Sequence, residues 1–368
     1  MEMTMQEKAQ TGRSPLRWGI LSTAGIAQKN WKAIHNSGNS VVTAVASRNA
    51  DRSRQFISQC QNEAPFPAPP AALGSYEELL ATRNVDAIYI PLPTGLRKEW
   101  VLHAAEAGKH VLCEKPCGLA ASDVQDMINA CRRNRVQFMD GVMFMHNPRL
   151  QRIRQVLDDG ASVGQIKRIM SIFSFLGAGD FFGANIRLHA DLEPAGCLGD
   201  LGWYPIRFAL WAMNWQLPRE VSGRTLATRG ATGSPTPVPA DFSGELIFND
   251  DTSAGFFCSF LTPYQQWVNV SGTKGYLRLE DFVHPRSDHE PVFELNEKQI
   301  PVKCCDCRGE HSTSRTTAQD ATMFRNFANQ VRSGKLNEEW PMMALRTQQV
   351  TDACLASARA QGKPVPVR

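Results

Sequence analysis

The chain has 368 residues, of which 42% are hydrophobic, so it is long enough to build two hydrophobic cores. Its 40 basic and 36 acidic side chains leave a net charge of +4, which gives no electrostatic footprint for nucleic acid or an anionic membrane surface. No apolar run approaches the roughly 18 residues of a membrane helix, and residues 1–14 contain no apolar segment of a signal peptide. We therefore expect a cytoplasmic protein whose residues 1–14 form a disordered tail and whose ten cysteines are free thiols.

The first part of the chain alternates short apolar runs with amphipathic segments. This rhythm is typical of βαβ units and predicts a parallel sheet of the nucleotide-binding kind over residues 15–141. The expected strands are 17–21, 41–46, 86–90, 110–113 and 137–139. The expected helices are 26–34, 52–60, 76–80, 97–107 and 122–133.

After Gly141 the pattern changes to long strands of alternating polarity. Alternation of this kind predicts antiparallel strands with one buried face, so we expect a second, α+β domain over residues 142–368. Its expected strands are 165–175, 243–248, 254–260 and 275–279, and its expected helices are 148–157, 206–213, 317–332 and 342–360. The segments 230–240 and 284–315 are expected to be insertions between strands.

The turn between the first strand and the first helix has small residues where a dinucleotide-binding fingerprint has glycines. Ser22, Ala24 and Ala27 stand at those three positions. Small residues let the backbone amides and the helix N-terminus approach a pyrophosphate, although an ordinary tight turn would have the same pattern. The candidate cofactor contacts here are Ser22, Thr23, Ala24, Gly25 and Ile26.

The end of the second strand indicates which dinucleotide is bound. A free ribose 2′-hydroxyl favours an acidic residue at this point, whereas a 2′-phosphate favours a cation and hydroxyl donors. The chain has Ser47 and Arg48 there, and the first acidic residue is Asp51. The pattern predicts NADP in preference to NAD; the alternative is an exposed arginine that caps the following helix.

Two further segments carry candidate chemistry. Lys115 directly follows an apolar strand end, where a lysine can reach a bound substrate, although most lysines at such places are solvated. Asp200 and Tyr204 are four residues apart, so on one helical turn they would share a face. From spacing alone, an N-capping aspartate beside a packed Trp203–Tyr204 pair is the simpler interpretation.

Taken together, these residues resemble the Gfo/Idh/MocA oxidoreductases. The resemblance rests on Arg17 to Ala24, on Ala107 to Pro116 with its Glu-Lys-Pro, on Asp200 to Tyr204 and on Glu339 to Pro341. It implies an N-terminal Rossmann domain and a C-terminal α/β domain with a large, open, mainly antiparallel sheet that often mediates oligomers. Many members have Asp-x-x-x-His, whereas this chain has a tyrosine at position 204. In this respect it resembles the branch with glucose-fructose oxidoreductase, dimeric dihydrodiol dehydrogenase and NADP-dependent xylose dehydrogenase.

The resemblance implies hydride transfer between the nicotinamide of NADP and a hydroxyl or carbonyl carbon of a sugar, polyol or cyclic diol. Tyr204 would be the acid/base, and the ammonium of Lys115 would lower its pKa and bind the substrate oxygen. The residues implied to orient the substrate are Asp200, Arg187, Asn185 and Trp203, of which Trp203 is first of all a packing residue. The further residues implied to border the cofactor are Pro91, Thr94, Glu114 and Pro116. The alternative is a dinucleotide-binding regulatory protein of the same fold without turnover.

Three further expectations concern partners and metals. Few helical patterns occur between residues 215 and 315, so one sheet face is expected to be covered by a second copy in a homodimer. Cys304, Cys305 and Cys307 form one compact cluster near His311, which is too few spaced ligands for a structural zinc site, so no metal is expected. His284, His289 and His311 are expected to be solvated loop residues.

Overall fold

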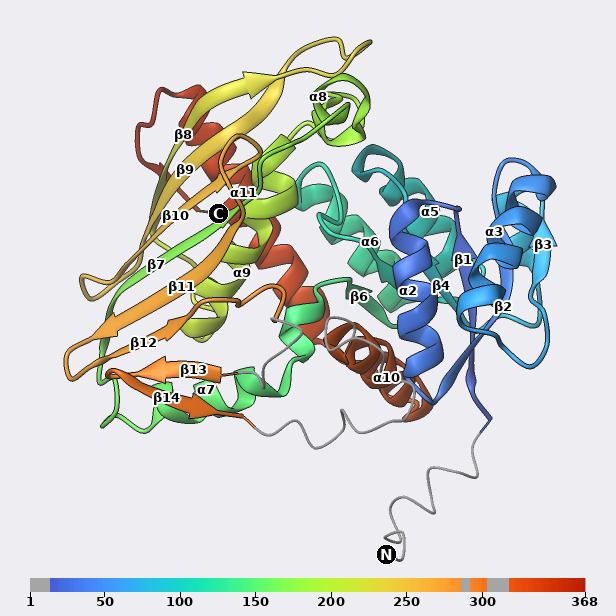
Figure 1. Ribbon diagram of the computed structural model, residues 1–368, viewed down its shortest axis with the longest axis horizontal. Helices are drawn as coiled ribbons and strands as arrows, with labels where there is room; N and C mark the ends of the chain where they lie inside the picture. Colours follow the sequence, from blue (N-terminus) through green and yellow to red (C-terminus); the bar gives the residue numbers. More distant parts are fainter. Residues whose placement is uncertain (1–13, 286–291, 303–317, 368) are drawn as a thin grey trace, which may run out of the picture.

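The computed structural model describes residues 14–285, 292–302 and 318–367. They form two sheets, one in each half of the molecule, with most helices lying between or beside them (Figure 1). The predicted tail, apart from Ser14, lies outside the described residues, and so do the cysteine cluster at 304–307 and the histidines at 289 and 311.

The first sheet is parallel and has six strands in the order β3-β2-β1-β4-β5-β6. Its strands are β1 (Leu16–Leu21), β2 (Ser40–Ala46), β3 (Ala71–Leu73), β4 (Ala87–Ile90), β5 (His110–Cys113) and β6 (Phe138–Asp140). Its helices are α2 (Gly25–Asn36), α3 (Ala50–Glu63), α4 (Tyr76–Ala81), α5 (Thr94–Glu106) and α6 (Ala121–Arg133). The order reverses beside β1, which is the switch point where such sheets bind ligands at the carboxyl ends of their strands.

The second sheet has nine strands in the order β14-β13-β12-β11-β7-β10-β9-β8-β15. Its strands are β7 (Ile166–Ser174), β8 (Glu220–Arg229), β9 (Val238–Ile247), β10 (Ser253–Ser259), β11 (Gln265–Gly272), β12 (Tyr276–Leu279), β13 (Val292–Leu295), β14 (Lys298–Pro301) and β15 (Val365–Pro366). Among the described strands of this second sheet, only the β7–β10 pair is parallel, so the prediction of a mainly antiparallel sheet is confirmed.

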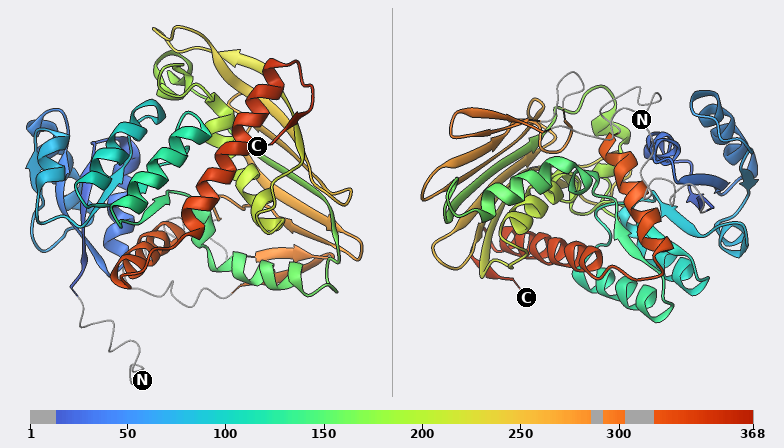
Figure 2. Two further views of the ribbon diagram at one scale, coloured as in Figure 1. Left: turned by 180° about the vertical axis from the view of Figure 1, so that it is seen from behind. Right: turned by 90° about the horizontal axis from the view of Figure 1, so that it is seen from below.

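The remaining helices join the two halves. They are α7 (Pro148–Asp158), α8 (Phe181–Ala184), α9 (Trp203–Ala212), α10 (Ala318–Arg332) and α11 (Glu339–Arg359), with short turns η1 (Met143–His146), η2 (Ile186–Leu188) and η3 (Leu198–Gly202). Helices α9 and α11 cover one side of the second sheet (Figures 1 and 2). The opposite side carries no helix in these views.

Helix α10 comes late in the chain but packs against the first sheet. Trp18 of β1 is fully buried against Phe324 and Phe327 of α10, with ring centroids 5.2 and 5.0 Å apart. The first sheet therefore depends on residues that come after β14, and so after eight of the nine strands of the second sheet, in sequence. We propose Gly141, between β6 and η1, as the boundary of the two domains, with α10 returning across it.

The expected elements agree with the structure apart from several strands that the sequence patterns did not reveal. Strands β3, β8, β11, β13, β14 and β15 were not expected. β9 begins at Val238, inside the segment expected to be an insertion, and it alternates buried and half-buried residues along its whole length. The prediction failed there because the Pro-rich letters before Asp241 resemble a loop, whereas pairing with β8 keeps them extended.

Candidate active site

Lys115 lies just beyond the carboxyl end of β5 and reaches into the second half of the molecule. Its ammonium donates to the Asp200 Oδ1 and to the Asp200 backbone oxygen, each at 2.7 Å. Only 11% of the Lys115 side chain is exposed. The strand-end lysine is thus not a solvated cation but part of a contact between the two domains.

Asp200 lies in η3, a single π-helical turn that leads directly into α9. Its second oxygen accepts from Arg187 Nε at 2.7 Å, so the carboxylate stands between two cations. Burial opposes ionisation, but the charges of Arg187 and Lys115 and their hydrogen bonds outweigh it and hold the Asp200 pKa well below its usual range. Asp200 is therefore occupied in holding Lys115 and Arg187 rather than left free to bind a substrate hydroxyl.

Tyr204 begins the next turn, on the same side as Asp200. The Lys115 ammonium lies 4.9 Å from the centre of the Tyr204 ring, over its face, and the phenol oxygen lies 3.8 Å from the Met143 sulfur. The phenol is almost fully buried. The structure therefore places Lys115 and Tyr204, the two residues that the sequence interpretation paired, next to each other.

The expected effect of Lys115 on the phenol is wrong for this structure. Burial, together with the carboxylates of Glu114 and Asp200, raises the pKa of Tyr204 well above 10. The ammonium contacts the ring rather than the hydroxyl, and Asp200 already balances its charge. Tyr204 is thus a neutral phenol at neutral pH.

Trp203 does not line the site. The side chain is fully buried, and its ring packs against the Arg207 guanidinium at 5.8 Å. The structure thus contradicts a substrate contact through this indole and supports the packing interpretation. The spacing of the tryptophans gave no means of separating the two possibilities.

Arg187 lies on η2, and Asn185 caps the start of that turn. Asn185 accepts from the Arg187 backbone amide at 3.0 Å and so fixes the start of this turn. The Arg187 side chain is 43% exposed, so its guanidinium still has donors that face solvent. Arg187 can therefore orient a substrate hydroxyl while it holds Asp200. The Asn185 side chain is already engaged by the backbone amide of Arg187.

The turn between β1 and α2 fits a dinucleotide pyrophosphate. Ser22 has a backbone φ of +123°, and its hydroxyl accepts from the Ala24 amide at 3.1 Å. The first turn of α2 has no side-chain cap and no acidic residue, and a side chain added at Gly25 would meet open space. Uncapped amides with room before them are what an anion at a helix N-terminus needs.

Ser47 and Arg48, the two cofactor candidates at the end of β2, have different surroundings. Ser47 is buried, and its hydroxyl donates to the Asn49 carbonyl at 2.6 Å, so it shapes the turn. Arg48 is exposed and makes no hydrogen bond or ion pair with any described residue. Arg48, rather than Ser47, is therefore the side chain available to a 2′-phosphate.

Thr94 and Glu114 are tied to the protein around them. The Thr94 amide and hydroxyl both donate to Glu193, at 2.9 and 2.6 Å, and Arg97 donates to the same hydroxyl. Glu114 accepts from the Tyr89 hydroxyl at 2.7 Å and from the Lys115 amide at 3.2 Å. Both residues hold the loops after β4 and β5 in place, and Glu193 is a partner that the sequence did not reveal. Pro91 and Pro116 lie in the same two loops.

His284 is a site residue that the sequence interpretation missed, because it was taken for a solvated loop histidine. Its ring packs edge to face against Phe173 at 6.0 Å, and Phe173 packs in the same way against Tyr204 at 5.3 Å. Burial and the charges of Lys29 and Lys115 lower the pKa of His284 to about 4. The apolar residues before it, Phe282 and Val283, are both buried and were the available signal.

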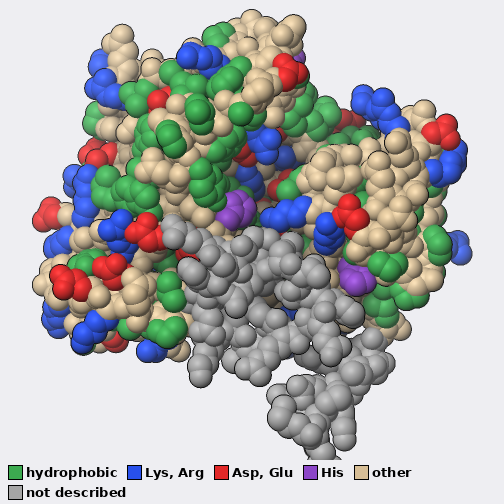
Figure 3. Space-filling model, viewed as in Figure 1, with side chains coloured by type: hydrophobic (Ala, Val, Ile, Leu, Met, Phe, Trp, Pro, Cys, Tyr) green, Lys and Arg blue, Asp and Glu red, His purple; other side chains and the backbone are tan. Residues whose placement is uncertain are grey.

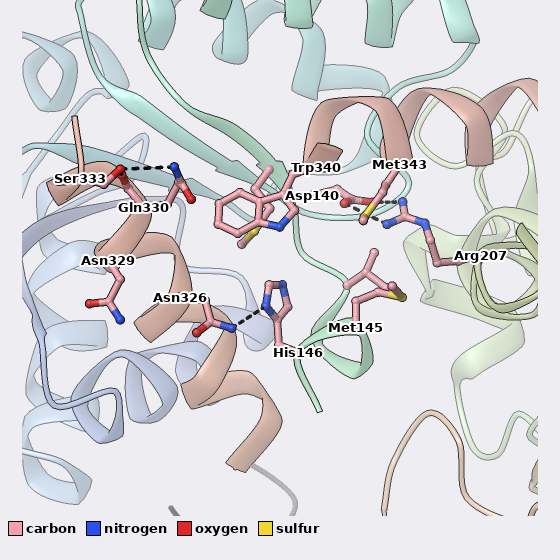
Figure 4. A pocket seen from close by; sticks show the side chains of 12 residues that line it. Asp140, Met145, His146, Arg207, Asn326, Asn329, Gln330, Ser333, Trp340 and Met343 are labelled. Carbon is pink, nitrogen blue, oxygen red and sulfur yellow. Dashed lines mark hydrogen bonds and ion pairs between the residues drawn. The ribbon is translucent and has the colours of Figure 1, made fainter. Parts of the chain in front are cut away.

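A space-filling view shows basic side chains gathered in the hollow between the two halves (Figure 3). A separate cavity of about 460 Å³ lies between β6, η1, α10, α11 and α9 (Figure 4). Its polar groups already pair with one another, as in Asn326 with His146 at 3.1 Å and in Asp140 with Arg207. Neither Lys115 nor Tyr204 lines this cavity, so it is not where we place the reaction.

The comparisons with known proteins agree with this geometry. The family described as "Oxidoreductase family, NAD-binding Rossmann fold" (GFO_IDH_MocA) matches residues 16–142, and the GFO/IDH/MocA C-terminal domain matches residues 150–278. The chain belongs to the Gfo/Idh/MocA oxidoreductase family. The predicted family, fold class and enzyme class are thereby confirmed, and the alternative of a regulator without turnover loses its support.

Several characterised relatives are similar over most of their length. D-xylose 1-dehydrogenase (NADP(+)) 2 of Haloferax volcanii is 32% identical over 71% of this chain and 75% of its own. Trans-1,2-dihydrobenzene-1,2-diol dehydrogenase of Mus musculus is 31% identical over 78% and 80%. A 3-ketoreductase from Actinomadura kijaniata, solved with NADP and TDP-benzene, is 26% identical with a TM-score of 0.78 over 94% of this chain and 98% of its own.

The part of the chain that the structure describes contains neither a metal-ion cluster nor a membrane-spanning helix. No group of three or more His, Cys, Asp or Glu side chains is arranged to hold a metal ion in that part of the chain. Within the same residues, no helix has the length and hydropathy needed to cross a membrane.

The paired carboxylate of Asp200 gives a stability prediction with a defined pH dependence. Asp200→Asn removes charge-assisted bonds to Lys115 and Arg187, so it should lower the free energy of unfolding at pH 7 by about 2 kcal/mol. The Asp200 pKa is lowered in the folded protein, so this stabilisation is complete above the unfolded pKa near 4 and is lost as pH falls further. Urea unfolding of both proteins from pH 3 to 8 measures the difference.

Glu338→Gln is the matched control, because Glu338 and its partner Arg132 are both more than half exposed. Exposed ion pairs of this kind contribute at most about 1 kcal/mol. An Asp200→Asn difference no larger than that of the control, or one that does not shrink below pH 4, would show that the pairing is not held in solution.

Proposed function

We propose that the protein is an NADP-dependent oxidoreductase that transfers a hydride between the nicotinamide and the hydroxyl or carbonyl carbon of a sugar, polyol or cyclic diol. The observation that carries the proposal is the meeting of Lys115, from the end of β5, with Asp200 and Tyr204, from the start of α9. The relatives named above act on a sugar, a diol and a keto sugar, with NADP in the name or structure of two of them.

The groups of the chain account for the proton in this reaction. The cofactor supplies or accepts the hydride at the carbon. In the direction of reduction, the Tyr204 phenol gives its proton to the carbonyl oxygen, and the Lys115 ammonium beside the ring stabilises the negative charge that develops on that oxygen. In the direction of oxidation, the Tyr204 phenol first releases its proton to solvent, and the resulting phenolate then takes the proton of the substrate hydroxyl.

The charges of the site favour an uncharged substrate. Lys115 and Asp200 already neutralise each other, and both Tyr204 and His284 are neutral at pH 7. Arg187 keeps exposed donors for hydroxyl oxygens. A neutral, hydroxylated ring or chain meets these groups without leaving a buried charge unpaired.

We also propose that the enzyme works in the cytoplasm. All seven cysteines within the described residues are buried and unpaired, as is usual in a reducing compartment.

Replacing the two catalytic candidates tests the proposal. NADP reduction is first measured with a panel of aldoses, inositols and vicinal diols, and the best substrate is then used with Lys115→Ala and Tyr204→Phe. Each variant should lower turnover by about 10²-fold to 10⁴-fold, the range for loss of acid-base assistance, with little change in NADPH affinity. Lys98→Ala and Tyr276→Phe, both remote from the site, should keep wild-type turnover. Absence of turnover by the wild type with the whole panel would contradict the proposed function.

The exposed Arg48 predicts the choice of cofactor. A charge-assisted bond from its guanidinium to a 2′-phosphate contributes roughly 1.5 to 3 kcal/mol, or about one to two orders of magnitude in affinity. Arg48→Ala should weaken NADPH binding by about that factor and barely change NADH binding, as measured by fluorescence titration. Arg52→Ala, one turn along α3, serves as the control. Equal loss of both cofactors would reduce Arg48 to a surface cation.

We propose a homodimer formed by the uncovered side of the second sheet. Phe257, Ile172 and Trp267 are paired neighbours on β10, β7 and β11, and they make a half-exposed apolar row across that side. Light scattering should give about twice the chain mass of 40.8 kDa, and Trp267→Glu should shift it towards a monomer. Leu96→Glu, which adds the same charge at an exposed position on α5, should leave the mass unchanged. A wild-type monomer at micromolar concentration would refute the dimer.

A further inference from the structure

His284 occupies a fixed position beside the reaction site. Its backbone amide donates to Gln266 Oε1, and its carbonyl accepts from Gln266 Nε2, both at 2.7 Å. The preceding carbonyl, that of Val283, accepts from Gln319 Nε2 at 2.7 Å. Both glutamines are buried, so the short segment after β12 is held from two sides. The imidazole is therefore positioned by the fold rather than carried on a loose loop.

The ring of His284 is linked to Tyr204 through one shared aromatic neighbour. Phe173 of β7 lies between His284 and Tyr204, with edge-to-face contacts to both rings. The charges of Lys115 and Asp200 both act on the imidazole, which places it within electrostatic reach of the ion pair that anchors the site. No described residue hydrogen-bonds either ring nitrogen. A half-buried imidazole with both nitrogens unused has its hydrogen-bonding capacity left for a ligand.

The state of the ring limits what it can do. Burial and the charges of two ammonium groups keep the imidazole neutral at physiological pH, so it cannot act as a general acid in the reaction. A neutral imidazole has one donor and one acceptor nitrogen, and a hydroxyl group likewise both donates and accepts. A carboxylate or a phosphate would find only one donor here.

We propose that His284 is a substrate-contacting residue that binds a hydroxyl group of the substrate next to the carbon that reacts at Tyr204, and so selects polyhydroxylated substrates. This inference rests on the proposed function, because it concerns the same site. It adds a specificity residue from the segment after β12, which lies 80 positions beyond Tyr204 in the chain.

Two substitutions at this position separate hydrogen bonding from packing. His284→Phe keeps an aromatic ring against Phe173 and removes both nitrogens, whereas His284→Asn keeps a donor and an acceptor and removes the ring. Loss of a neutral hydrogen bond should raise KM for the best polyol of the panel by about 3-fold to 10-fold in His284→Phe, with kcat nearly unchanged. His284→Asn should recover part of that loss. If the ring serves only packing, the order of the two variants is reversed.

Deoxy analogues and a remote control complete the test. The His284→Phe penalty should disappear for the one monodeoxy analogue of that polyol that lacks the contacted hydroxyl, and NADPH affinity should match the wild type in both variants. His103→Phe, the same exchange on the exposed face of α5, should leave KM unchanged. Wild-type KM values in His284→Phe for every polyol and analogue would overturn this inference alone. A wild type without turnover would instead overturn the proposed function, and it is recognised before any variant is made.

Discussion

The carboxylate of Asp200 is the contact on which the site depends. It accepts from Lys115, which belongs to the first sheet, and from Arg187, which precedes η3 in the second half of the chain. A lysine has a flexible four-carbon stem, so without this partner its ammonium would have no fixed place over the Tyr204 ring. The π-helical turn that carries Asp200 continues directly into α9, so one continuous segment fixes the positions of both Asp200 and Tyr204. The ion pair that joins the two domains therefore also places Lys115 beside Tyr204.

Beside the network of Lys115, Asp200 and Arg187, the phenol of Tyr204 and the imidazole of His284 are uncharged. The Tyr204 phenol is buried and the His284 imidazole is half-buried, and desolvation disfavours the charged form of each. Uncharged groups in a poorly solvated site can exchange hydrogen bonds with a hydroxylated substrate at little electrostatic cost. These two groups therefore suit the sugar or diol hydroxyls of the proposed reaction.

Much of this architecture could be predicted from the sequence, because the first sheet is built from regular βαβ units whose apolar runs stand out. The pairing of Lys115 with Tyr204 was also predicted, but from the resemblance to the oxidoreductase family, because spacing alone favoured an N-capping Asp200 beside a packed aromatic pair. Strands such as β11 escaped notice since residues 265–272 alternate with mostly polar letters, and β3 has only three residues. The positions of His284 and Glu193 beside the site could not be predicted, because each depends on which distant segments pack together. Local periodicity contains no information about such contacts.

The placement of α10 has a consequence for how the protein is made. Trp18 of β1 is fully buried only because Phe324 and Phe327 cover it, and Lys29 of α2 pairs with Asp320 of the same late helix. During synthesis the first sheet is therefore complete in sequence about 180 residues before the helix that seals it leaves the ribosome, at a rate of roughly 5 to 20 residues per second. For an interval of about ten seconds or more, the nascent N-terminal domain presents an apolar face with a tryptophan at its centre. The full chain, not the nucleotide-binding half, is the unit that can bury it.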